Sequence, residues 1–184
     1  MEYLNMYLPL DIRITSIWEA APRFHARLNA TKKHYRYIID TNPYQDVFTR
    51  KYATHLPGNY DLHAMKEAAA LLTGEHDFKS FCSIRTQVED TVRRIYSITI
   101  KKNEDDRIDI RISGNGFLYN MVRIIVGSLV KVGCGFWKPE QIKEALEARD
   151  RSKAGPKAPA EGLTLISIAV SYTHLRAHET TLHL

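Results

Sequence analysis

Residues 117–132 have the sequence FLYNMVRIIVGSLVKV, an apolar stretch with a full charge at its centre, Arg123. A helix that is apolar on nearly all sides is normally buried, so this stretch predicts a core helix. The positions three and four residues away from Arg123 hold no acid; they are Tyr119, Asn120, Val126 and Gly127. The helix therefore cannot neutralise its own cation, and the partner of Arg123 must come from elsewhere.

Two interpretations of Arg123 fit the residues around it. A buried guanidinium is tolerated only when it is paired and hydrogen-bonded, so Arg123 can belong to an ion pair that only fixes packing. It can equally be a cation placed in an active site, where perturbed charges gather. The local sequence leaves this choice open.

The stretches on either side of this helix predict the fold class. Residues 107–113 alternate strictly, which places Ile108, Ile110 and Ile112 on one face of a strand and charged residues on the other. Apolar spacing predicts further strands and helices; the strands are residues 11–19, 33–40, 91–101 and 163–170, and the helices start at Asp61 and near Pro139. Because strands and helices do not alternate regularly, we expect an α+β fold: a largely antiparallel sheet with helices packed on one face.

Composition limits the class of protein. The 184 residues are 44% hydrophobic and 26% charged, which is typical of a soluble globular domain. A net charge of +5 suits a polyanionic partner but also arises without one. Cys82 and Cys134 are far apart in sequence and suggest neither a disulfide framework nor a cysteine zinc site. No stretch is long and apolar enough to span a bilayer, and no signal peptide is evident, so we expect a cytoplasmic protein without a membrane partner.

The sequence predicts neither a metal site nor a cofactor. His174 and His178 lie four residues apart, but no cysteine or carboxylate pattern completes a ligand set. Gly114-Asn115-Gly116 lacks the third glycine of a dinucleotide-binding loop. Residues 171–184 show no apolar period, so we expect one domain over residues 1–170 and a tail over 171–184 that is disordered or foreign to the fold.

Basic and aromatic residues interleave at His34-Tyr35-Arg36-Tyr37. On a strand, Tyr35 and Tyr37 share one face while His34 and Arg36 share the other. One interpretation is a core tyrosine pair behind a solvated charged face. The other is an RNA site, in which a tyrosine stacks on a splayed base and nearby cations contact phosphates.

Seven short segments, in order and spacing, resemble the TruA family of tRNA pseudouridine synthases. Together they extend from about residue 4 to 170; they are Leu4-Asn5 with Leu8-Pro9 and Asp11-Ile12-Arg13, Phe24-His25-Ala26-Arg27, Tyr35-Arg36-Tyr37, Gly74-Glu75-His76-Asp77-Phe78, Gly116-Phe117-Leu118 with Met121-Val122-Arg123 and Val126-Gly127, Lys153-Ala154-Gly155-Pro156, and Glu161-Gly162-Leu163.

The resemblance implies a pseudouridine synthase-like fold and isomerisation of uridines in the anticodon stem-loop of tRNA. It implies that Tyr35 stacks on the uracil and that Arg123 pairs with and orients a catalytic aspartate. Arg27, Lys33 and Arg36 become candidate RNA-binding residues in a basic cleft. It further implies a homodimer that needs no metal and no organic cofactor.

The family's catalytic aspartate lies in an Arg-Thr-Asp motif upstream of the segment matched by Leu4-Asn5. We therefore expect this chain to be the C-terminal portion of such an enzyme, without that aspartate and inactive alone. Aspartates such as Asp77 and Asp150 occupy family positions that have no nucleophilic role. The alternative is a non-catalytic RNA-binding or dimerisation module.

Overall fold

The computed structural model describes residues 1–83 and 89–171, and these divide into two units. One unit contains Met1–Asn29 together with Ser171, and the other is Ala30–Val170. The predicted tail, with His174 and His178, lies outside the described residues apart from Ser171.

The first unit contains the short helix α1 (Glu2–Asn5). The strand predicted over residues 11–19 is wrong, because these residues form neither helix nor strand. Ile14 instead exchanges two hydrogen bonds with the side chain of Asn5, at 2.9 and 2.8 Å. Alternating apolar residues make a strand only when a second strand completes the backbone ladder, and no described strand pairs with this stretch.

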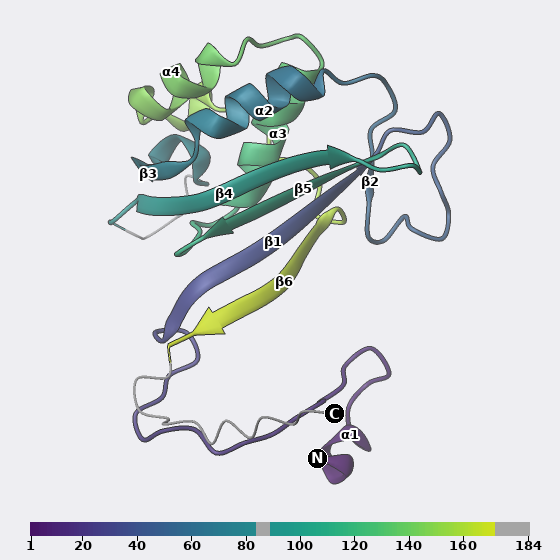
Figure 1. The fold of residues 1–184 in the computed structure, drawn as a ribbon, viewed down its shortest axis with the longest axis vertical. Coiled ribbons are helices and arrows are strands. Elements are labelled where there is room, and N and C mark those ends of the chain that lie inside the picture. The colour runs from purple at the N-terminus through teal and green to yellow at the C-terminus, as the bar shows by residue number, and fades with distance from the viewer. Residues whose placement is uncertain (84–88, 172–184) are drawn as a thin grey trace, which may run out of the picture. The chain divides into compact units, whose positions relative to one another are not determined.

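Six strands of the second unit form one sheet among the described residues, in the order β2-β1-β5-β4-β3, with β6 also paired to β1. Figure 1 shows the long central strands crossing the unit. The bounds are β1 (Ala30–Asp40), β2 (Thr54–His55), β3 (Gly74–Asp77), β4 (Val92–Lys102), β5 (Arg107–Gly114) and β6 (Leu163–Val170). The β1–β2 pair is parallel, and the other pairs are antiparallel. The predicted largely antiparallel sheet is confirmed.

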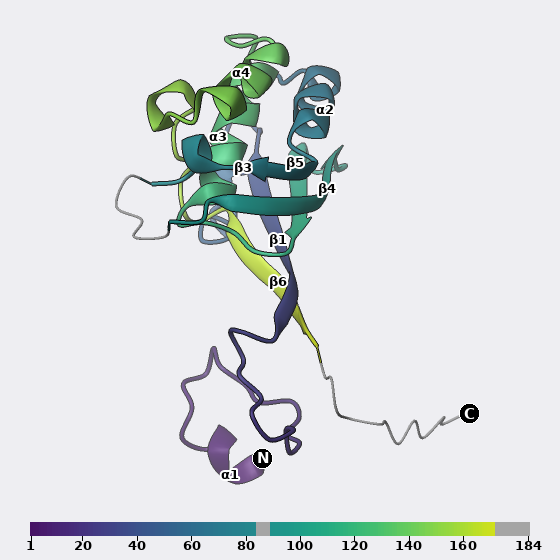
Figure 2. The same cartoon turned by 90° about the vertical axis from the view of Figure 1, so that its left-hand side faces the viewer.

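Three helices cover one face of this sheet, as Figures 1 and 2 show. They are α2 (Leu62–Leu71), α3 (Met121–Gly133) and α4 (Glu140–Ala148), with the short 3₁₀ turns η1 (Lys79–Phe81) and η2 (Arg151–Lys153) between elements. The carboxylate of Asp61 caps α2 by accepting hydrogen bonds from the backbone N–H groups of His63 and Ala64. The predicted α+β layering is therefore confirmed.

The two faces of the sheet differ in chemistry. Ile108, Ile110 and Ile112 of β5 are buried beneath the helices, as their alternation predicts. Between them, Asp109 and Arg111 point to the opposite face, which no helix described for the Ala30–Val170 unit covers. This uncovered side is called the open face below, and the other the helical face.

Helix α3 lies in the core and is buried along most of its length. It begins at Met121, four residues later than the apolar run, because Asn120 at its N-cap takes the left-handed conformation with φ of 62°. Within the described residues, no helix combines the length and apolar character needed to cross a membrane.

Candidate active site

Arg123 lies in the first turn of α3 and is half-buried. Its Nε donates a hydrogen bond of 2.7 Å to the backbone carbonyl of Ala158, and one terminal nitrogen lies 3.5 Å from the side-chain oxygen of Asn120. Among the described residues, no carboxylate lies within salt-bridge distance of this guanidinium. The cation is thus oriented by neutral acceptors but not neutralised by them.

The loop that holds Arg123 runs over residues 154–162 and packs closely on α3. A Cβ atom at Gly127 would lie 1.8 Å from the carbonyl oxygen of Pro156, and one at Gly155 would lie 2.6 Å from the Cα of Ser128. Ser128 Oγ accepts a hydrogen bond of 2.9 Å from the backbone N–H of Gly155. Glycine is needed at both positions because only a missing side chain lets helix and loop approach this closely.

Tyr37 of β1 anchors the same loop from the sheet. Its buried hydroxyl donates to the carbonyl of Pro159 at 2.8 Å and lies 2.6 Å from Thr54 Oγ1. Burial raises the pKa of Tyr37 to about 12; the Thr54 hydrogen bond opposes the rise, Glu161 adds to it, and Arg123 opposes it. This hydroxyl therefore remains a protonated donor at neutral pH.

Tyr35 stands two residues before Tyr37 on the same face of β1. Its half-buried ring packs against the core and meets the ring of Phe117 edge-on, with 5.2 Å between ring centroids. Phe117 lies just before α3, so Tyr35 and Arg123 flank the start of this helix on the helical face. Tyr35 and Arg123, the two site residues that the resemblance implies, therefore lie on the same side of the sheet.

The candidate RNA-binding residues have different surroundings. Arg36 points to the open face, where its Nε contacts the carboxylate of Asp109 at 3.0 Å. Lys33 is half-buried on β1, opposite Gly114 of β5. Arg27 is exposed and belongs to the Met1–Asn29 unit.

Two aspartates mentioned above have local structural partners. Asp77 contacts Arg149 Nε at 3.1 Å. Asp150 caps η2, and hydrogen bonds from the side chain and then the backbone of Ser152 lower its pKa. Both carboxylates thus have local partners, and neither forms an ion pair with Arg123.

Sequence reasoning missed the groups that position Arg123. A backbone carbonyl such as that of Ala158 carries no side-chain signal, so its role emerges only from the fold. The sequence shows Asn120 only as a neutral neighbour of Arg123, whereas in the structure its side chain donates to Ser83 Oγ at 2.8 Å and links the helix start to the segment after η1. Gly127 and Gly155 both lie in segments that match the family. The close approach of α3 and the loop is the physical reason why glycine is needed at these positions.

Within residues 1–83 and 89–171, no group of three or more histidine, cysteine or acidic side chains could hold a metal ion.

Comparison with known proteins gives the family. Residues 68–172 match the model of the family described as tRNA pseudouridine synthase. The chain belongs to the tRNA pseudouridine synthase family.

Similar curated proteins carry the name tRNA pseudouridine synthase A. The protein from Bacillus pumilus (strain SAFR-032) is 50% identical over 162 residues, covering 88% of this chain and 65% of its own length. The Brevibacillus brevis (strain 47) protein is 51% identical, covering 88% and 66% respectively. The Bacillus sp. (strain KSM-64) protein is 46% identical over 168 residues, covering 91% and 68%. This tRNA pseudouridine synthase family member therefore spans slightly less than two thirds of the first two relatives.

Among solved structures, a chain from the "Crystal Structure of a Cbf5-Nop10-Gar1 Complex" aligns with a TM-score of 0.31 and 16% identity. The alignment covers 57% of this family member and 28% of that chain.

Proposed function

We propose that this chain supplies the uracil-stacking and carboxylate-orienting part of a site that converts uridine to pseudouridine in the anticodon stem-loop of tRNA. The observation that carries the proposal is the unneutralised Arg123, held by the Ala158 carbonyl on the same side of the sheet as Tyr35. A fixed, half-buried guanidinium with no acidic partner among the described residues is well suited to an anion supplied from elsewhere.

The chemistry explains why such a cation is needed. Uracil must leave the ribose, rotate, and rejoin through carbon without escaping. An aspartate from residues outside this chain would attack the ribosyl-uracil unit, and a neighbouring guanidinium lowers the pKa of a carboxyl and keeps it ionised and oriented. Arg123 therefore positions the nucleophile and does not itself react.

Tyr35 would hold the base during this rotation. Its ring is fixed at one edge by Phe117 and remains partly exposed, which leaves apolar surface for a base to stack on. A uridine in a stem-loop must leave its own stack to reach this ring. In this proposal tRNA is the substrate, the enzyme acts in the cytoplasm as a homodimer, and its chemistry needs neither metal nor organic cofactor.

Reconstitution tests the proposed function. We expect the isolated chain to form no pseudouridine in an unmodified tRNA transcript, and the chain joined to the N-terminal segment of the Bacillus pumilus relative to form it. In the joined enzyme, Arg123→Gln should lower kcat by roughly 10²- to 10³-fold, because the carboxylate loses its preorganised partner. Tyr35→Ala should lower activity as well, because the base loses its stacking surface.

Lys143→Gln is the matched control for charge removal, since Lys143 is exposed on α4 and, among the described residues, forms an ion pair only with Glu147. Full activity in Arg123→Gln would contradict the proposal. Pseudouridine formed by the isolated chain would reveal a nucleophile within it.

The alternative function is a non-catalytic RNA-binding or dimerisation module. The observation that favours it is the same lack of an acidic partner for Arg123 among the described residues. If the joined enzyme binds tRNA tightly and never forms pseudouridine, the module replaces the enzyme as the function of this chain.

A further inference from the structure

The open face of the sheet carries two arginines directly opposite each other. Arg36 of β1 and Arg111 of β5 are register partners in the antiparallel ladder. Like charges at directly opposed positions destabilise a sheet unless something compensates them. A negative charge near this pair would therefore stabilise the face.

Asp109 compensates only part of this charge. Its carboxylate contacts Arg36 at 3.0 Å and Arg111 at 3.2 Å, so one anion serves two guanidinium groups. The side chain of Asp109 is 13% exposed, whereas those of Arg36 and Arg111 are 39% and 66% exposed. One positive charge is left over, and it faces solvent.

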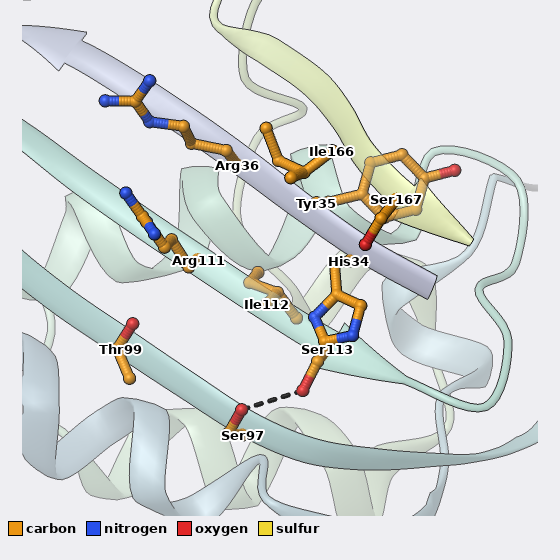
Figure 3. Close-up of a pocket in the computed structure, with 10 residues that line it drawn as sticks. All are labelled: His34, Tyr35, Arg36, Ser97, Thr99, Arg111, Ile112, Ser113, Ile166 and Ser167. Atoms are coloured by element: carbon orange, nitrogen blue, oxygen red, sulfur yellow. Dashed lines mark hydrogen bonds between the residues drawn. The ribbon is translucent and has the colours of Figure 1, made fainter. Parts of the chain in front are cut away.

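A pocket of about 360 Å³ lies beside this arginine pair. Figure 3 shows its lining side chains, which come from β6, β1, β5 and β4. Next to the arginines stands a row of hydroxyl groups and one imidazole, aligned across the strands by register: Ser97, Ser113, His34 and Ser167. Among the described lining residues there is no aspartate or glutamate. Hydroxyl, imidazole and guanidinium donors around a concave surface match the oxygens of a phosphate.

A cation and an aromatic ring extend the same face toward the N-terminal end of β1. The ammonium of Lys32 lies 5.4 Å from the ring centroid of Tyr96, which is 42% exposed. Cations interleaved with exposed aromatic rings are the pattern of surfaces that follow an RNA backbone. This pattern favours a nucleic acid over a small anion.

We propose that the pocket around Arg36 and Arg111 binds a backbone phosphate of RNA. The inference rests on the proposed function in taking tRNA as the source of that phosphate. Tyr35 is also among the residues that line the pocket, so the phosphate site adjoins the residue proposed to stack on the uracil.

Salt-dependent binding of an unmodified tRNA transcript to the full chain tests the pocket. Arg111→Gln should weaken binding roughly threefold and reduce the slope of log affinity against log salt by about 0.7 to 0.9, the value of one lost phosphate contact. Asp109→Asn should act in the opposite direction, because it frees both arginines while still accepting a hydrogen bond from Arg36. Lys66→Gln, on the exposed side of α2, is the matched control and should leave the slope unchanged.

Equal slopes in all variants would overturn the proposal. So would an Arg111→Gln chain that binds tRNA normally but changes its sedimentation, because the face would then join two copies of the chain. In the joined enzyme, Arg111→Gln should raise KM for tRNA far more than it lowers kcat, unlike Arg123→Gln. If that enzyme forms no pseudouridine, the proposed function fails while the binding slopes still decide the pocket.

Discussion

Tyr37 shows how a single hydroxyl fixes the candidate site. It joins β1 to the carbonyl of Pro159, one residue beyond the carbonyl that orients Arg123. Because the ring is fully buried, a lost donor leaves that carbonyl without its protein partner. The position of Arg123 therefore depends on a residue that plays no part in the proposed chemistry.

The pH dependence of stability tests this role. The pKa of Tyr37 is about 12 in the folded chain against 10.0 for an unperturbed tyrosine, chiefly because of burial. The folded state holds this proton more tightly, so its contribution is complete below pH 10 and is lost as pH rises toward 12. Urea unfolding at pH 8, 10 and 11 should show the unfolding free energy falling as pH rises. In Tyr37→Phe this fall should be smaller.

Tyr37→Phe should also cost about 1 to 3 kcal/mol at pH 8, the penalty for an unsatisfied buried acceptor. Burial also raises the pKa of Tyr60 to about 12. Part of the fall in unfolding free energy with rising pH therefore remains in the Tyr37→Phe variant. Tyr44→Phe, on a ring that is 89% exposed, serves as the matched control. An unchanged unfolding free energy in Tyr37→Phe would contradict the anchoring role.

At the scale of elements, the contact between α3 and the loop over residues 154–162 determines the site. Gly127→Ala would place a methyl group 1.8 Å from the Pro156 carbonyl, so helix and loop must separate. We expect a loss of roughly 1 to 3 kcal/mol or more in unfolding free energy. In the joined enzyme, activity should fall even where the variant remains folded, because Ala158 no longer holds Arg123.

Gly116→Ala is the control for this variant. Its added Cβ would lie 3.5 Å from the nearest atom, Cδ of the Arg93 side chain, which is an ordinary van der Waals distance. Thermal melting and pseudouridine formation measure the two effects separately. Wild-type melting and activity in Gly127→Ala would show that the loop does not position Arg123.

Elements with local signals could be predicted from the sequence. The β6 strand matches its predicted bounds, and Asp61 caps α2 as expected. The short strands β2 and β3 were not predicted, because Thr54–His55 and Gly74–Asp77 become strands only through pairing with residues distant in the chain. The pocket at Arg36 and Arg111 depends on strand register in the same way. The prediction of Tyr35 and Arg123 as site residues rests on family resemblance, which carries three-dimensional information that periodicity lacks.

At the scale of the whole molecule, β6 is an edge strand of the sheet among the described residues. It pairs with β1 along one edge, and no described strand pairs with its other edge. Leu165, Ile166 and Ile168 are 44%, 55% and 45% exposed. An unpaired, apolar edge strand is a template for pairing with another chain.

We therefore expect the isolated chain to self-associate with rising concentration in sedimentation velocity. Ile168→Lys should reduce this association, because a charged side chain on an edge strand disfavours strand addition. Lys66→Gln, far from β6 on the exposed side of α2, should leave it unchanged. The same measurement on the chain joined to the N-terminal segment of its relative has two informative outcomes. If the joined chain still associates through β6, this edge takes part in the proposed homodimer. If Ile168→Lys no longer has an effect, the added segment covers this edge. Monomeric behaviour of the isolated chain at every concentration would show that the edge is already protected.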